Sequence, residues 1–189
     1  MNVFKCVCVG IVAILLCGCF ESRAEFNALN LGKVNALYEN GALKIMPHCD
    51  GECPKQSSDS QQSAKFANEA KQSFIENQKD NTPFALFFFT TTCGVCKAQI
   101  PILQEIAKSN GARIYAILGN APDRRKAVEY ASANAMSLPL FYESGAKRFF
   151  SQIVGGVKGV PVVVVFDKDG KIKERFIGLT PKSVLKSTL

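Results

Sequence analysis

The sequence predicts an α/β fold with a mixed sheet covered by helices on both faces. Three runs are almost wholly apolar: residues 84–90 (FALFFFT), 112–118 (ARIYAIL) and 160–166 (VPVVVVF). Their length and lack of alternation are typical of central strands buried on both faces. Helical periodicity between the runs indicates strands with helices packed on the sheet. After the Asp169-Gly170 turn, alternating residues 171–178 (KIKERFIG) add a half-exposed strand in a hairpin, which makes the sheet mixed.

Further segments complete the predicted order of elements. Asn40-Gly41 is the strongest two-residue hairpin signal, and it divides residues 33–46 into two apolar-rich strands. Ser63 is the expected N-cap of a helix over residues 63–78, which Asp80 to Pro83 ends. The other expected elements are a helix after Cys96 with Ile100, Leu103, Ile106 and Ala107 on its apolar face, a helix from Pro122 to about Asn134, a strand over 138–143, a helix over 146–154 that Gly155-Gly156 ends, and a helix from Pro181 to Leu189.

The first residues of the chain predict an export signal instead of a part of the fold. Lys5 precedes an apolar run over residues 7–16, which is shorter than the roughly 20 residues of a membrane-spanning helix. Residues 16–19 resemble the lipobox of bacterial lipoproteins, and Cys19 is the expected lipidation site because the small residue Gly18 precedes it. A plain cleaved signal and an uncleaved one are the alternatives. Multiple acyl chains would anchor the protein stably at the periplasmic face of a bacterial membrane.

A chain of 189 residues has room for one ordinary domain with appendages. We expect a signal peptide over residues 1–18, a lipid-anchored tether with a hairpin extension over 19–62, and the main domain over 63–189. Within the extension, residues 21–33 are the expected tether. The net charge of +7 is spread along the chain, and the one tight basic cluster at residues 124–126 is typical of a solvated helix face. Because no aromatic residues alternate with basic ones, nucleic acid is not an expected partner.

The mature chain keeps two close cysteine pairs in a compartment that permits disulfides. In CGVC, Cys93 and Cys96 lie where a buried strand ends and a helix begins. Backbone N–H groups and the positive end of the helix dipole favour a thiolate on Cys93, and Lys97 adds positive charge. Cys93 is therefore the expected nucleophile, and Cys96 is the cysteine that resolves the mixed disulfide. A metal site, of which two cysteines supply only half, and a purely structural disulfide are the alternatives.

Two prolines complete a pattern that resembles a known family. Pro101 lies in the body of the helix after the cysteine pair, and Val160-Pro161 opens the third apolar run. A strand, a CxxC motif, a helix containing proline and a later cis proline resemble the thioredoxin fold over about residues 65–189. Residues 137–161 look like the strand–helix insertion of the TlpA/ResA-like branch. Those proteins are exported, membrane-tethered thioredoxins, and many of them serve cytochrome c maturation.

The resemblance implies that Cys93 and Cys96 form the redox pair, with Pro161 as a cis proline beside them. It also implies that the backbone of Val160 offers hydrogen bonds to a substrate strand. One departure is neutral Gln99, at the position where many relatives carry an acid that helps to move the proton of the resolving thiol.

Other departures concern residues before the motif. Phe87 stands where thioredoxin has a buried acid, Phe89 and Thr92 stand where relatives have aromatic residues, often Trp, and the chain contains no Trp. Since both proton acceptors are missing, solvent or another side chain has to deprotonate Cys96. The preferred direction of the redox reaction therefore stays open.

The second pair, Cys49 and Cys53, flanks a turn that contains glycine. A structural disulfide in the N-terminal extension is the expected interpretation. A second redox or regulatory pair is one alternative. The other is a copper or zinc site that includes His48, the only histidine of the chain.

These features predict a lipid-anchored extracytoplasmic thiol-disulfide oxidoreductase that needs no cofactor. The expected reaction is reduction of disulfides in exported proteins such as apocytochrome c, by dithiol–disulfide exchange at CGVC. The expected partners are proteins with disulfides or thiols, a membrane thiol electron donor of the DsbD type, and the membrane itself. A disulfide oxidase or isomerase is the first alternative. A non-catalytic lipoprotein that binds metal or a partner through residues 34–54 is the second.

Overall fold

The structure is a computed structural model that describes residues 22–47, 82–120 and 123–189. The expected signal peptide, Cys19, the second cysteine pair with His48, and the helix over 63–78 lie outside the described residues. Among the helices in the described ranges, none has the length and apolar character needed to cross a membrane.

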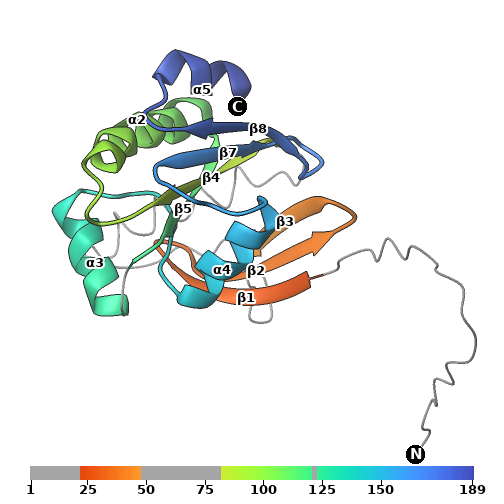
Figure 1. The fold of residues 1–189 in the computed structure, drawn as a ribbon, viewed down its shortest axis with the longest axis horizontal. Coiled ribbons are helices and arrows are strands. Elements are labelled where there is room, and N and C mark those ends of the chain that lie inside the picture. Colours follow the sequence, from red (N-terminus) through yellow and green to blue (C-terminus); the bar gives the residue numbers. More distant parts are fainter. Residues whose placement is uncertain (1–21, 48–81, 121–122) are drawn as a thin grey trace, which may run out of the picture.

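One mixed sheet organises the fold, with strand order β3-β2-β1-β6-β5-β4-β7-β8 (Figure 1). Strand β4 is parallel to β5 and β5 is parallel to β6, whereas the other neighbours are antiparallel. The strands are β1 (Ser22–Leu29), β2 (Gly32–Glu39), β3 (Ala42–Pro47), β4 (Phe84–Phe89), β5 (Arg113–Leu118), β6 (Leu140–Phe141), β7 (Val162–Phe166) and β8 (Ile172–Ile177). The helices are α2 (Gly94–Asn110), α3 (Arg124–Ala133), α4 (Ser144–Ile153) and α5 (Lys182–Thr188). The predicted α/β class with a mixed sheet is confirmed.

Side chains of the central strands alternate between two apolar cores. All six residues of β4 are buried. Phe87 and Phe89 belong to the core shared with α2, α3 and α5. Phe84 and Leu86 belong to the core shared with α4 and strands β1 to β3. Burial on both faces explains why this run contains no polar residue.

The expectation of a free tether over residues 21–33 is wrong for much of that stretch. Ser22–Leu29 form β1, which pairs antiparallel with both β2 and β6. The physical reason is a period of two, since Phe26 and Ala28 are buried while Glu25 and Asn27 are exposed. The N-terminal strands therefore extend the sheet of the main domain instead of forming a separate appendage.

The predicted hairpin at Asn40-Gly41 is confirmed. Both residues have positive φ, 53° and 79°, as a two-residue type I′ turn requires. Strand β3, the second strand of this hairpin, then reaches the turn between β7 and β8, where the Leu43 N–H donates to the Gly170 carbonyl at 2.7 Å. This contact joins one edge strand of the sheet to a turn near its other edge.

The environment of Tyr130 in α3 predicts how stability changes at alkaline pH. Its ring packs against Phe89 with centroids 5.7 Å apart, and its buried hydroxyl has no hydrogen-bond partner in the described part of the chain. Burial raises the pKa of the Tyr130 phenol. Because the folded-state pKa lies above the unfolded value of about 10, the folded state holds the phenol proton more tightly than the unfolded state does. The resulting contribution to the free energy of unfolding is present below pH ~10 and is lost as the pH rises above it.

The variant Tyr130→Phe is expected to remove this alkaline loss and to leave stability at neutral pH unchanged or slightly higher, because the buried hydroxyl has no partner within the described ranges. Urea unfolding between about pH 7 and 11 measures both effects, with half-buried Tyr142→Phe as the control. Equal alkaline loss in the wild type and in Tyr130→Phe would contradict the prediction.

Candidate redox site

The cysteine pair lies at the junction between β4 and α2. A turn at Thr91 and Thr92 follows β4, and Cys93 comes directly before the first residue of α2. Cys93 and Cys96 form a disulfide with their Cα atoms 5.2 Å apart, within the usual range for such bonds. The expected placement at a junction of strand and helix is therefore confirmed.

Cys93 is the N-cap residue of α2. Its Sγ accepts a hydrogen bond from the Cys96 N–H at 3.1 Å, and the first turn of the helix contains no acidic residue. The N–H groups at a helix N-terminus and the helix dipole stabilise negative charge. In the dithiol state the same arrangement favours a thiolate on Cys93.

The two sulfurs differ in access to solvent. Cys93 is partly exposed, whereas Cys96 is fully buried in the core under α2. An incoming thiol or disulfide therefore meets Cys93 first. Cys96 is placed to attack Cys93 from within the protein.

The cis proline lies beside this pair, although it is far away in the sequence. The Val160–Pro161 peptide bond is cis, and the Val160 carbonyl oxygen lies 3.8 Å from Cys93 Sγ. The Pro161 carbonyl accepts a hydrogen bond from the Gly178 N–H at 2.9 Å, which fixes the loop to the end of β8. The structure thus brings together Cys93, Cys96, Val160 and Pro161.

Gln99 and Lys97 occupy different environments on α2. Lys97 is exposed. Gln99 is fully buried, and its amide makes two hydrogen bonds with the Thr180 backbone: it donates to the carbonyl at 3.2 Å and accepts from the N–H at 2.7 Å. Gln99 therefore ties α2 to the loop before α5, and both polar ends of its side chain are occupied.

Asn120 is a site residue that the sequence interpretation missed. Its side chain accepts a hydrogen bond from the Thr91 N–H and donates to the Thr91 hydroxyl, both at 2.9 Å. Asn120 thereby stabilises the turn that comes directly before Cys93. The available signal was its position, since a polar residue just after β5 lies at the same sheet edge as the end of parallel strand β4.

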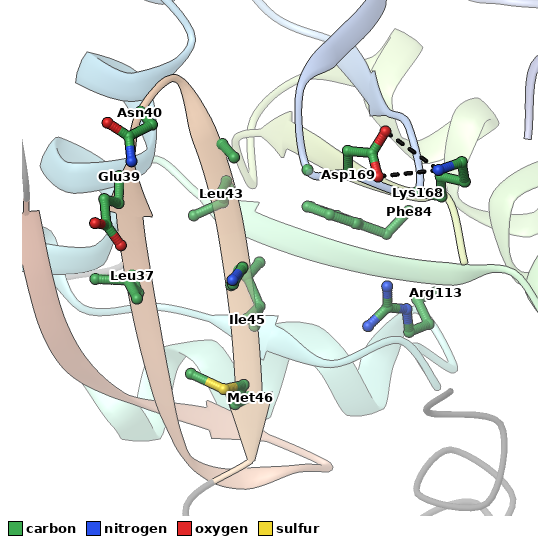
Figure 2. Close-up of a pocket in the computed structure, with 13 residues that line it drawn as sticks. Leu37, Glu39, Asn40, Leu43, Ile45, Met46, Phe84, Arg113, Lys168 and Asp169 are labelled. Atoms are coloured by element: carbon green, nitrogen blue, oxygen red, sulfur yellow. Dashed lines mark hydrogen bonds and ion pairs between the residues drawn. The ribbon is translucent and has the colours of Figure 1, made fainter. Parts of the chain in front are cut away.

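Two of the cavities on the described surface differ in their distance from the disulfide. The larger, of about 590 Å³, lies between the β2–β3 hairpin and the β7–β8 turn, and its lining residues include Arg113, Met46 and the ion pair of Lys168 with Asp169 (Figure 2). Its lining within the described residues includes no cysteine. Arg113, one of its lining residues, donates from its guanidinium to the Thr82 carbonyl at 2.6 Å. The smaller cavity, of about 220 Å³, borders Val160.

Comparison with known proteins places the fold in a family. The thioredoxin-like domain family matches residues 70–189, which is more than half of the chain. The chain is 29% identical over 104 residues to the chloroplastic M-type thioredoxin of Zea mays, and the match covers 55% of this chain and 47% of that protein. It is 28% identical over 120 residues to the thioredoxin of Pyropia yezoensis, covering 63% of this chain and 85% of that protein. The chain thus spans about half the length of the maize relative.

Solved structures show the same fold at low sequence identity. A candidate thioredoxin of Neisseria meningitidis aligns with a TM-score of 0.53 and 12% identity, over 88% of this chain and 85% of that one. A thiol:disulfide interchange protein of Chlorobium tepidum aligns with a TM-score of 0.51 and 21% identity, over 58% of this chain and 78% of that one. The thioredoxin fold expected from the sequence is confirmed.

Proposed function

Because the chain belongs to the thioredoxin-like domain family, an oxidoreductase family, we propose that it exchanges disulfides through Cys93 and Cys96. The observation that carries the proposal is the disulfide at the N-terminus of α2, with Cys93 partly exposed and Cys96 buried. The Val160–Pro161 backbone beside Cys93 offers polar groups to an extended client segment. No cofactor is required, since the two cysteines carry both electrons.

The reaction starts from the dithiol form of the protein. The Cys93 thiolate attacks one sulfur of a client disulfide, a bond forms between Cys93 and that sulfur, and the client disulfide breaks and releases a client thiolate. The leaving thiolate takes up a proton from solvent. The Cys96 thiol then loses its proton and attacks Cys93 Sγ, which releases the second client thiolate. Two electrons pass to the client, and the Cys93–Cys96 disulfide remains.

The direction and place of this reaction follow the resemblance to the TlpA/ResA-like branch. We propose a reductase at the periplasmic face of a bacterial membrane, anchored by lipid on Cys19. Its clients are exported proteins such as apocytochrome c, and a membrane donor of the DsbD type returns two electrons to the disulfide.

A second candidate function, disulfide oxidation or isomerisation, is favoured by one feature of the site. Helix α2 stabilises the Cys93 thiolate, while Phe87 and Gln99 occupy the two positions where relatives place proton acceptors. A stabilised thiolate favours the dithiol form of the protein and so makes the disulfide a stronger oxidant. The reduction potential separates the two directions, because about 30 mV corresponds to 1.4 kcal/mol.

Trapping with Cys96→Ser tests the proposal in the intact protein. Without the resolving thiol, Cys93 is expected to hold client proteins as mixed disulfides that survive non-reducing electrophoresis. Cys93→Ser is the matched control and is expected to capture none. Equal capture by both variants, or capture by neither while the purified wild type fails to reduce insulin, would refute the proposal.

A further inference from the structure

The smaller cavity lies directly beside the redox pair. It is formed by the ends of β4 and β5, by α4 and by the loop that leads to Pro161, and we call it the Val160 cavity. Its lining includes the apolar side chains of Phe88, Ile117, Val157 and Val160 together with the side chains of Lys147 and Lys158.

The position of the cavity relative to Cys93 follows from one shared residue. Val160 lines the cavity, and its carbonyl oxygen lies 3.8 Å from Cys93 Sγ. A client segment whose sulfur meets Cys93 therefore lies at the edge of the cavity. In an extended segment, successive side chains advance by about 3.3 Å, so a side chain a few residues from the client cysteine reaches it.

The two lysines give the cavity a positive rim. Lys147 comes from α4, and its ammonium donates to the Gly119 carbonyl at 2.8 Å at the end of β5. Lys158 is exposed in the loop before Pro161. Neither lysine forms an ion pair within the described ranges, and the described lining of the cavity contains no acidic residue. Within the described part of the chain, both ammonium groups can therefore still pair with a carboxylate of another molecule.

We infer that the Val160 cavity is a specificity pocket for the client protein. It takes an apolar side chain that lies within a few residues of the client's reactive cysteine, while an acidic side chain next to it pairs with Lys147 and Lys158. The inference rests on the proposed function, because it places the client sulfur at Cys93. Its partner is thus an acidic, apolar segment of an exported protein, which complements the +7 charge of this chain.

The test uses four peptides and the reduced full-length protein. Each peptide carries one cysteine in a mixed disulfide with thionitrobenzoate. The same pair of residues is placed both before and after this cysteine. The pair is Leu-Glu, Leu-Gln, Gly-Glu or Gly-Gln in the four peptides. Attack by Cys93 forms a bond to the peptide sulfur, and the coloured thionitrobenzoate anion leaves. The second-order rate constant reports recognition of each peptide.

The wild type is expected to prefer Leu over Gly by tenfold or more, because an apolar side chain enters the cavity. It is expected to prefer Glu over Gln by about tenfold, with each lysine contributing about threefold. Lys147→Gln combined with Lys158→Gln should abolish the preference for Glu and keep the preference for Leu. The control Lys108→Gln changes the net charge by one unit about 20 Å along α2 from the cysteine pair, and it should change neither preference.

Three outcomes overturn the inference or its premise. Equal rates for all four peptides, with normal reduction of a small disulfide such as oxidised glutathione, would refute the pocket and leave the proposed function intact. An equal loss from Lys108→Gln would also refute it, since general electrostatic attraction would then explain the preference. Failure of the wild type with the small disulfide would instead refute the proposed function.

Discussion

Replacement of Gln99 by leucine is expected to lower the free energy of unfolding by roughly 2–6 kcal/mol. The Thr180 N–H and carbonyl both bond to the Gln99 amide in the buried space between α2 and the loop before α5. Leucine removes both partners and leaves two buried backbone groups unsatisfied, at about 1–3 kcal/mol each. Chemical denaturation of the oxidised protein measures the loss.

Two further variants separate hydrogen bonding from other effects. Gln152→Leu, on the exposed surface of α4, is the matched control and should change stability by less than about 0.5 kcal/mol. Gln99→Glu keeps the acceptor for the Thr180 N–H, but an ionised carboxylate faces the Thr180 carbonyl. Burial raises the pKa of such a carboxyl above the unfolded value of about 4.3, so its deficit should be small near pH 4 and grow as the pH rises to 7. A Gln99→Leu protein as stable as the wild type would show that these bonds contribute little.

Gly170→Ala is expected to cost roughly 2–5 kcal/mol. The residue has φ +78°, and a Cβ at this position would lie 2.3 Å from the Leu43 carbonyl oxygen and 3.1 Å from the Leu43 carbonyl carbon and nitrogen. The left-handed conformation costs a non-glycine residue about 1–2 kcal/mol. Displacement of β3 from the turn adds about 1–3 kcal/mol of packing loss. The Leu43 amide, which donates to Gly170, should also exchange its hydrogen with solvent faster.

The control for Gly170→Ala is Gly155→Ala. Gly155 has a similar φ of +75°, but nothing lies within 4 Å of a Cβ there. The Gly155→Ala variant should lose only the free energy that the left-handed backbone conformation costs a non-glycine residue. If both variants lost the same stability and left hydrogen exchange at Leu43 unchanged, the contact between β3 and the β7–β8 turn would not support the fold.

The part of the fold that the sequence predicts well is the part with short-range signals. The run FALFFF contains no polar residue because β4 is buried on both faces, and Asn40-Gly41 adopts the two positive φ angles that its composition favours. Strand β1 was missed because only Phe26 and Ala28 are buried among its polar neighbours. Its place between β2 and β6 depends on pairing with residues more than 100 positions later. No local pattern carries that information.

In the candidate site too, features with a local sequence pattern are predicted and contacts between distant residues are not. The spacing of the cysteines in CGVC predicts the disulfide. The Val160-Pro161 dipeptide predicts a cis bond only in combination with CGVC. The bonds from Asn120 to Thr91 and from Gln99 to Thr180 join residues that the chain separates by 29 and 81 positions. Polar side chains of these types have many uses, so their partners emerge only in three dimensions.

The start of β1 at Ser22 has a consequence for how far the domain can move from its anchor. With an acyl group on Cys19, as proposed, only three residue steps separate the anchor from the first residue of the sheet. A fully extended chain spans at most about 3.6 Å per residue, which limits this link to about 11 Å. A free tether through residue 33 would have allowed roughly 50 Å. With that anchor, the domain would stay in a shallow layer along the lipid surface, and clients would have to approach the membrane to meet Cys93.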